Sequence, residues 1–133
     1  MSVWDESGSF AASEPAAFDT ALAFGDWKAD WIWKPGPVRI NDFAYFRKTF
    51  ETPTFPLDRA RVFVSAHHYV HLFVNGTRVG GYGSPAPTLP ADRKLYLTYD
   101  ITGLIRQGLN AFGAIVHYLG GSGQNYVDGK PGF

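Results

Sequence analysis

The dipeptide Asn75-Gly76 lies between two short segments of alternating apolar and polar residues, and it restricts the fold more than any other feature. Asn and Gly readily adopt positive φ, which a type I′ turn requires at both central positions. In the segment before it, residues 69–74, every second residue is aliphatic, so that one face of a strand there is apolar. Because such a turn joins neighbouring antiparallel strands, the sequence predicts a β-hairpin whose return strand covers 77–79.

The same alternation recurs after residue 28, and turn-forming residues separate the segments. The chain has 15 Gly and 9 Pro to form turns, and 17% of its residues are aromatic, a type enriched in strands. A single helical turn is expected over 101–105. These features predict an all-β, antiparallel jelly-roll β-sandwich. The predicted strands, in chain order, are 31–33, 45–50, 61–66, 69–74, 77–79, 95–99 and 110–118.

Charge and composition exclude several classes of function. Twelve Lys and Arg balance twelve Asp and Glu, so a nucleic-acid partner is not expected. No apolar run is long enough for a membrane span, and we expect no membrane partner. The chain has no Cys, which excludes disulfides, thiolate catalysis and Cys-based zinc sites. The glycine segments 80–83 and 120–123 lack the Lys-Ser/Thr of a phosphate loop, so we expect no cofactor.

The first 26 residues differ from the rest, because they contain acidic residues and no Lys or Arg. They lack the basic and apolar regions of a signal peptide. Residues 13–25 have the spacing of a short amphipathic helix, with Ser13 as its cap and Gly25 at its end. A disordered arm is the alternative. We therefore divide the chain into a leader, residues 1–26, and a β-sandwich domain, residues 27–133.

Four segments, taken together and in order, resemble the N-terminal β-sandwich domain of bacterial α-L-rhamnosidases and related glycoside hydrolases. The resemblance covers roughly residues 28–133. The first segment combines an aromatic entry motif with the strand that follows it, and the third contains the Asn-Gly turn. The segments are Trp31-Ile32-Trp33 with Tyr45-Phe46-Arg47-Lys48-Thr49-Phe50, then Ala60 to Ala66, then Tyr69 to Gly80, then Leu97 to Asn110.

This resemblance implies a galactose-binding-like fold that accompanies a catalytic helical barrel carrying the acidic residues. The rest of such a glycosidase, as a catalytic domain or companion chain, is the implied partner, together with rhamnose-containing carbohydrate. The compartment stays open between the bacterial cytoplasm and secretion within a larger protein. The family often has Trp after the hairpin and after the last segment, whereas this chain has Ser84-Pro85 and Leu119-Gly120 there. A sugar site built on those tryptophans is therefore not transferred.

The C-terminal residues suggest that the sandwich is incomplete. A jelly roll of this kind needs at least one further strand after Pro131-Gly132-Phe133, and without it an apolar edge stays unpaired. We therefore expect this chain to be a fragment of a longer protein.

The segment His67-His68-Tyr69-Val70-His71 suggests a metal site. In a regular strand, however, His67 and His71 are about 13 Å apart, too far for one ion. His68 faces the other way, although a bend at 67–69 or the approach of His117 would relax this. We assign no metal ligands and expect partly exposed histidines. A small enzyme that uses His67, His68 or His117 is a weaker alternative, which needs these imidazoles and a carboxylate in one cleft.

Carbohydrate contact is one interpretation of the aromatic residues near loops, because pyranose rings pack on aromatic faces while polar groups bind the hydroxyls. Aromatic residues at alternating strand positions are expected to pack in the core instead, including Trp31 and Trp33. The loop carboxylates are too scattered to predict a glycosidase pair, so no catalytic residue is assigned. With the resemblance, this predicts a non-catalytic accessory domain of an α-L-rhamnosidase-like glycoside hydrolase, and an autonomous carbohydrate-binding module is the alternative. The candidate carbohydrate-binding residues are Tyr82, Tyr118, Asn125, Tyr126 and Asp128.

Overall fold

The computed structural model describes residues 2–16, 18, 20–23, 25–54, 56–84, 94–123 and 126–133, with the backbone alone at 82–84. The chain divides into two compact units, Met1–Asp30 and Trp31–Phe133. The boundary predicted from composition, between residues 26 and 27, lies close to this division. No helix among the described residues is long and apolar enough to cross a membrane.

The first unit contains a β-hairpin that the sequence analysis did not predict. Strands β1 (Ser2–Trp4) and β2 (Phe10–Ala12) pair antiparallel, and the Trp4 and Phe10 rings lie 5.1 Å apart between centroids. Asp5 organises the turn, because its Oδ1 accepts from the backbone N–H groups of Ser7 and Ser9 at 2.9 and 2.8 Å. A short polar side chain of this type commonly bonds to the backbone close after it.

The helix predicted over 13–25 does not form among the described residues of that segment. A helix of this length is marginal in water because its first turn fixes several residues for one hydrogen bond. A tertiary surface is what stabilises such helices in proteins, and this unit supplies only a two-stranded hairpin.

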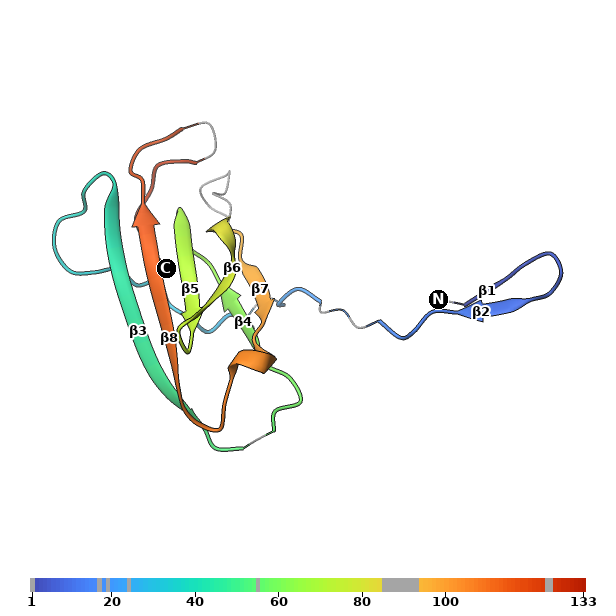
Figure 1. The fold of residues 1–133 in the computed structure, drawn as a ribbon. Coiled ribbons are helices and arrows are strands. Elements are labelled where there is room, and N and C mark those ends of the chain that lie inside the picture. Colours follow the sequence, from blue (N-terminus) through green and yellow to red (C-terminus); the bar gives the residue numbers. More distant parts are fainter. Residues whose placement is uncertain are drawn as a thin grey trace. The chain divides into compact units, whose positions relative to one another are not determined.

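The second unit is an antiparallel β-sandwich, as predicted. A four-stranded sheet has the order β3-β8-β5-β6, and β4 pairs with β7 in a second layer (Figure 1). All the predicted strands except 31–33 form, although several bounds shift. The elements are β3 (Asp42–Thr52), β4 (Arg61–Val64), β5 (Tyr69–Val74), β6 (Thr77–Ser84), β7 (Leu97–Asp100), the 3-10 turn η1 (Thr102–Leu104) and β8 (Gly108–Tyr118).

The core lies between the two layers and consists mainly of small aliphatic side chains. Strand β5 shows the underlying pattern, because Val70, Leu72 and Val74 are buried while the residues between them are not. Partly buried aromatic rings pack around this cluster, including Phe46, Phe50 and Phe112 as predicted. Its buried members are Val64, Ala66, Val70, Leu72, Val74, Val79, Ile101, Ile105, Ala114 and Val116.

The Asn75-Gly76 turn has the predicted conformation, with φ values of 50° and 85°. The Asn75 amide also connects the hairpin to the rest of the sheet. Its Nδ2 donates to Leu104 O at 2.8 Å and to Asn110 Oδ1 at 2.7 Å, and its Oδ1 accepts from Ala111 N at 2.9 Å. One side chain thus joins the hairpin, the loop that contains η1 and strand β8.

Asn110 is the second amide of this network and is only 1% exposed. Its Nδ2 donates to the carbonyl oxygens of Arg106 and Gly108 at 2.7 and 2.9 Å, and to Thr52 Oγ1 at 3.2 Å. Its Oδ1 accepts from Arg106 N at 3.0 Å. Because buried polar groups without a partner are costly, this side chain holds the loop before β8 in place.

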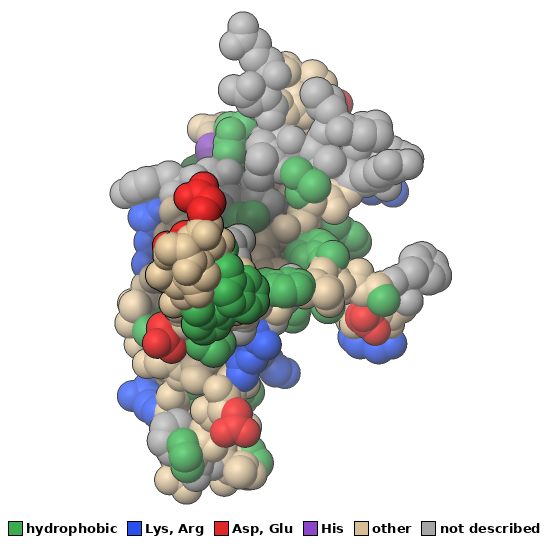
Figure 2. Space-filling view, turned by 90° about the vertical axis from the view of Figure 1, so that its right-hand side faces the viewer, with side chains coloured by type: hydrophobic (Ala, Val, Ile, Leu, Met, Phe, Trp, Pro, Cys, Tyr) green, Lys and Arg blue, Asp and Glu red, His purple; other side chains and the backbone are tan. Residues whose placement is uncertain are grey.

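Charges are mixed on the surface. On the face shown in Figure 2, acidic and basic side chains are scattered singly and hydrophobic side chains lie between them. The mixture of signs on this face is in line with the zero net charge of the chain.

We predict that Asn110→Leu lowers the free energy of unfolding by about 2–4 kcal/mol, because a side chain of similar size leaves several buried groups without partners. Urea unfolding followed by tryptophan fluorescence measures this. Gln107→Leu is the matched control on the same loop, where the side chain is exposed, and it should stay within about 0.5 kcal/mol of the parent. Equal effects of the two substitutions would contradict the assigned role of Asn110.

Candidate binding pocket

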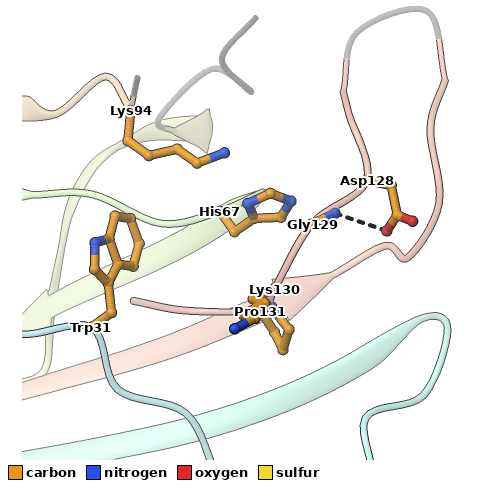
Figure 3. A pocket seen from close by; sticks show the side chains of 7 residues that line it. All are labelled: Trp31, His67, Lys94, Asp128, Gly129, Lys130 and Pro131. Carbon is orange, nitrogen blue, oxygen red and sulfur yellow. Dashed lines mark hydrogen bonds between the residues drawn. The ribbon is translucent and has the colours of Figure 1, made fainter. Parts of the chain in front are cut away.

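A pocket of about 520 Å³ lies at one end of the sandwich, where four parts of the chain meet (Figure 3). Trp31 comes from the segment before β3, and His67 comes from the connection between β4 and β5. The remaining described residues that line it are Lys94, Asp128, Gly129, Lys130 and Pro131. We call this cavity the Trp31 pocket.

The connection between the two layers bends at His67 and His68, which lie outside both strands. The Nε2 atoms of both imidazoles lie 3.0 Å from Val127 O. A carbonyl oxygen can only accept, so both rings donate through Nε2. His68 Nδ1 in turn accepts from Leu119 N at 3.0 Å, so that ring is neutral and both of its nitrogens are bonded.

The two imidazoles are buried, at 5% exposure for His67 and 1% for His68. Burial lowers the pKa of both, and the positive charge of Lys94 lowers each further. The carbonyl of Val127 opposes this shift in both rings, but desolvation is the larger effect. Both histidines are therefore neutral at pH 7.

The expectation of partly exposed histidines is wrong for this pair. That expectation assumed that the alternation of a strand continues through residues 66–69. The bend ends the alternation, so two successive side chains turn to the same region, and their ring centroids lie 4.4 Å apart. His117 lies apart from this arrangement, stacked on Phe43 and bonded to Asn41 Oδ1 at 2.6 Å.

Tyr118 holds the C-terminal loop and is only 7% exposed. Its hydroxyl lies 2.7 Å from Gly129 O and 3.1 Å from Asp128 Oδ1, and its ring stacks on His68 at 5.0 Å. Burial raises the pKa of Tyr118, with Asp128 adding to the effect. The candidate Tyr118 therefore positions this loop and offers no free ring face to a ligand.

Asp128 is exposed and lines the pocket, but its carboxylate is engaged within the loop. Its Oδ1 accepts from Gly129 N at 2.8 Å as well as from Tyr118. These hydrogen bonds, the one from Gly129 first, lower the pKa of Asp128. A lowered pKa keeps the group ionised at pH 7, so Asp128 is an acceptor and no proton donor there.

The last residues of the chain close the pocket from one side. Ile32 and Phe133 exchange both backbone hydrogen bonds at 3.1 Å, and His67 N donates to Gly132 O at 2.9 Å. The predicted strand 31–33 is thus only a single pairing. A side chain at Gly129 would meet the His67 ring at 2.5 Å, and one at Gly132 would meet the Trp31 ring at 2.7 Å. Both glycines are needed for this close approach.

Trp31 is a correction to the sequence analysis, which placed it in the core. Its side chain is 50% exposed and lines the pocket, whereas Trp33, two residues on, packs against the core. Alternation put both indoles on the core face, but residues 31–33 are outside the regular strands. The amino-acid pattern therefore gave no means to separate the two.

The other candidates are only partly gathered here. Tyr126 is half-buried, and its ring meets His68 edge-on at 5.2 Å, so it packs behind the pocket. Tyr82 lies in β6, and its side chain is outside the described residues, as is all of Asn125. Sequence analysis missed Lys94, because a single lysine before a strand carries no recognisable signal.

The described residues contain no group of three or more His, Asp or Glu side chains that could hold a metal ion. Bringing His67 and His68 together is not sufficient for a metal site. Both Nε2 atoms carry a proton toward Val127 and His68 Nδ1 accepts from Leu119 N, so of the two rings only His67 Nδ1 keeps a lone pair for a metal. A metal ligand must present a nitrogen lone pair.

Comparison with known proteins identifies the family. Residues 56–127 match the protein family described as "Alpha-L-rhamnosidase N-terminal domain". The chain belongs to this family. The resemblance inferred from the sequence is thereby confirmed, and the sandwich is the fold of an α-L-rhamnosidase N-terminal domain.

Individual relatives agree with this assignment. An α-L-rhamnosidase of Formosa agariphila is 31% identical over 87% of this chain, and one of Alteromonas sp. (strain LOR) is 30% identical over 85%. Among solved structures, the GH78 family rhamnosidase of Bacillus sp. GL1 is 32% identical over 80% of the chain, with a TM-score of 0.72. The α-L-rhamnosidase from Aspergillus terreus is 30% identical over 71% of the chain, with a TM-score of 0.59.

The matched relatives are much longer than this α-L-rhamnosidase N-terminal domain. The chain spans 15% of the Formosa relative, 14% of the Alteromonas relative and 11% of the Bacillus structure. The matched part is therefore one section of a larger glycosidase in those proteins.

The buried histidines predict a decrease in thermal stability between pH 7.5 and 5.5. As the pH falls below the ordinary histidine pKa of 6.5, His67 and His68 bind protons in the unfolded chain. In the folded domain their pKa values are lower, so they bind protons only at a lower pH. Acidification in this window therefore favours unfolding, and the loss is absent above it. The midpoint temperature, measured by circular dichroism, should fall as the pH is lowered.

His68→Asn tests the source of this effect, because an amide can donate to Val127 and accept from Leu119 without titrating. We expect a shallower pH dependence in this variant than in the parent. His71→Asn, on strand β5, is the control and should keep the full decrease. If His68→Asn and the parent lose the same amount between pH 7.5 and 5.5, His68 is not the titrating group.

Proposed function

We propose that this chain is a non-catalytic accessory domain of an α-L-rhamnosidase-like glycoside hydrolase, which supports the catalytic part and contacts carbohydrate through the Trp31 pocket. The observation that carries the proposal is the half-exposed indole of Trp31 beside polar and charged groups in one cavity. A pyranose face packs on such a ring, and the polar groups bind its hydroxyls. Rhamnose-containing carbohydrate is the substrate class that the relatives' names suggest.

The chemistry of the pocket supports binding without hydrolysis. Glycoside hydrolysis commonly uses two carboxyl groups on opposite sides of the scissile bond. Among the described residues that line the Trp31 pocket, Asp128 alone is acidic, and its Oδ1 is bonded to Gly129 N and Tyr118. The two histidines point their Nε2 protons at Val127 and so are held as structural groups.

A second cavity supports the role as a partner of the catalytic part. An apolar groove of about 360 Å³ lies between β3 and β4. Strand β4 pairs with β7 alone among the described strands, so one edge of β4 has no strand beside it. We propose that a β-strand from the rest of the longer glycosidase occupies this groove and pairs with β4. The apolar lining includes Ile32, Phe46, Val62, Leu72, Phe112 and Phe133.

The autonomous carbohydrate-binding module is the second candidate, and it rests on the same pocket. The two candidates differ in what the rest of the glycosidase contributes. An autonomous module binds saccharide with the same affinity alone and within the longer protein. An accessory domain contributes to a site or a fold that needs both parts.

We predict that this chain alone releases no p-nitrophenol from p-nitrophenyl α-L-rhamnopyranoside above the buffer rate. The reason is that the described lining of the Trp31 pocket has one carboxylate instead of two, and the assay follows the absorbance of p-nitrophenolate during prolonged incubation. Turnover that survives repurification and disappears in Asp128→Asn would overturn the non-catalytic assignment.

We predict that Trp31→Ala weakens saccharide binding by roughly tenfold, because it removes the ring face on which a pyranose packs. Isothermal titration calorimetry with rhamnose and with rhamnose-containing oligosaccharides measures this. Trp4→Ala, an exposed indole in the first unit, is the control and should leave the affinity unchanged. Equal binding by parent and Trp31→Ala would place the sugar elsewhere, and no binding at millimolar sugar would leave only the supporting role.

A further inference from the structure

Lys94 is the charged group in the Trp31 pocket whose bonding is incomplete. Its Nζ is buried, and no described residue accepts a hydrogen bond from it. Figure 3 shows the side chain extended across the pocket, with Nζ beside the His67 ring and the Trp31 indole on the same side of the cavity. Lys94 thus forms part of the pocket wall, and its buried ammonium group lies next to the cavity.

The neighbouring groups that the structure describes do not neutralise this charge. His67 and His68 donate through Nε2 toward Val127, and these neutral rings carry no negative charge. Asp128 lies on the far side of Gly129 in Figure 3, where its carboxylate is bonded to the Gly129 N–H. Lys130 also lines the pocket and adds a second positive charge. Among the described residues that line the pocket, two positive charges thus stand against the one negative charge of Asp128.

An ammonium group without an acceptor in a buried position destabilises the folded domain. Burial lowers the pKa of Lys94, which is the same cost expressed as a proton equilibrium. A ligand that brings a negative charge to Nζ offsets this cost on binding, and hydrogen bonds between charged groups are stronger than those between neutral ones. A neutral hydroxyl offers a weaker acceptor.

We propose that the Trp31 pocket binds an acidic sugar residue, with its anionic group on Lys94 Nζ and its ring face on the Trp31 indole. The inference deepens the proposed carbohydrate contact and rests on it. The anion is a carboxylate, as in a uronic acid, or a sulfate ester, since both present several oxygen acceptors to one ammonium group. The pocket thereby selects an acidic unit within a saccharide that also contains neutral sugars.

The test compares two ligands that differ only at one carbon. Methyl β-D-glucuronide carries a carboxylate where methyl β-D-glucoside carries a hydroxymethyl group. Titration calorimetry at low salt should show the glucuronide binding at least tenfold more tightly, in line with the strength of hydrogen bonds to charged groups. A second pair of titrations compares L-rhamnose 3-sulfate with L-rhamnose and tests the sulfate ester. The anion that increases the affinity more over its neutral counterpart is the one that the pocket prefers.

Lys94→Met is the decisive variant, because it keeps the length of the side chain and removes the charge. We expect it to bind the glucuronide and the glucoside equally, so that the selectivity disappears. Lys48→Met removes a positive charge from strand β3 and is the control. This variant should still bind the glucuronide more tightly than the glucoside. The thermal midpoint of Lys94→Met should be equal to or higher than that of the parent, because an unpaired buried charge has been removed.

The outcomes separate this inference from the proposed function. Equal affinity for the glucuronide and the glucoside in the parent, with both lost in Trp31→Ala, overturns the acidic-sugar inference and keeps carbohydrate contact. Binding of acetate or inorganic sulfate as tightly as the acidic sugars means a simple anion site and overturns the role of Trp31. No binding of any of these sugars contradicts both.

Discussion

The carbonyl oxygen of Val127 accepts hydrogen bonds from two buried imidazoles, and much of this end of the sandwich depends on that arrangement. His67 and His68 belong to the connection between the two layers, while Val127 belongs to the C-terminal loop. The second nitrogen of His68 binds Leu119 N just after β8. Three segments distant in sequence are thus joined through two neutral rings whose burial disfavours protonation. The loop that forms one wall of the Trp31 pocket is positioned by this contact.

The opposite end of the sandwich is joined by amides instead of imidazoles. Asn75 and Asn110 connect the hairpin, the loop with η1 and strand β8 through hydrogen bonds that do not titrate. This difference has a physical consequence for acid stability. The end with Asn75 and Asn110 keeps its bonds as the pH falls, whereas the end with the pocket depends on rings that gain protons on unfolding. The pocket is accordingly the more acid-sensitive part of the domain.

Sequence analysis succeeded where one local rule decided the structure. Positive φ at Asn75 and Gly76 predicted the hairpin, and alternation predicted which face of β5 is buried. It failed where the chain leaves regular structure. The bend at His67 and His68 and the single pairing at Ile32 broke the alternation, so burial of the histidines and exposure of Trp31 were both missed. Lys94 became visible only through its surroundings, because an unpaired ammonium group is a property of contacts that no residue pattern records.

The polar groups around Lys94 explain why its lack of a partner is informative. Several polar groups at this end have a defined bond: both nitrogens of His68, the Tyr118 hydroxyl and Asp128 Oδ1. Trp33 Nε1, whose ring meets Tyr118 edge-on, is buried without a partner among the described residues, as Lys94 Nζ is, but it carries no charge. Asp128, the acidic residue nearest to the pocket chemistry, is used to hold the loop and not to move a proton. Buried polar groups in proteins are generally satisfied, and a charged one costs most when it is not, so the buried ammonium group of Lys94 points to a ligand that supplies its acceptor. The positive charge of Lys94, in the same pocket as the exposed indole of Trp31, favours recognition of an anionic sugar over bond cleavage.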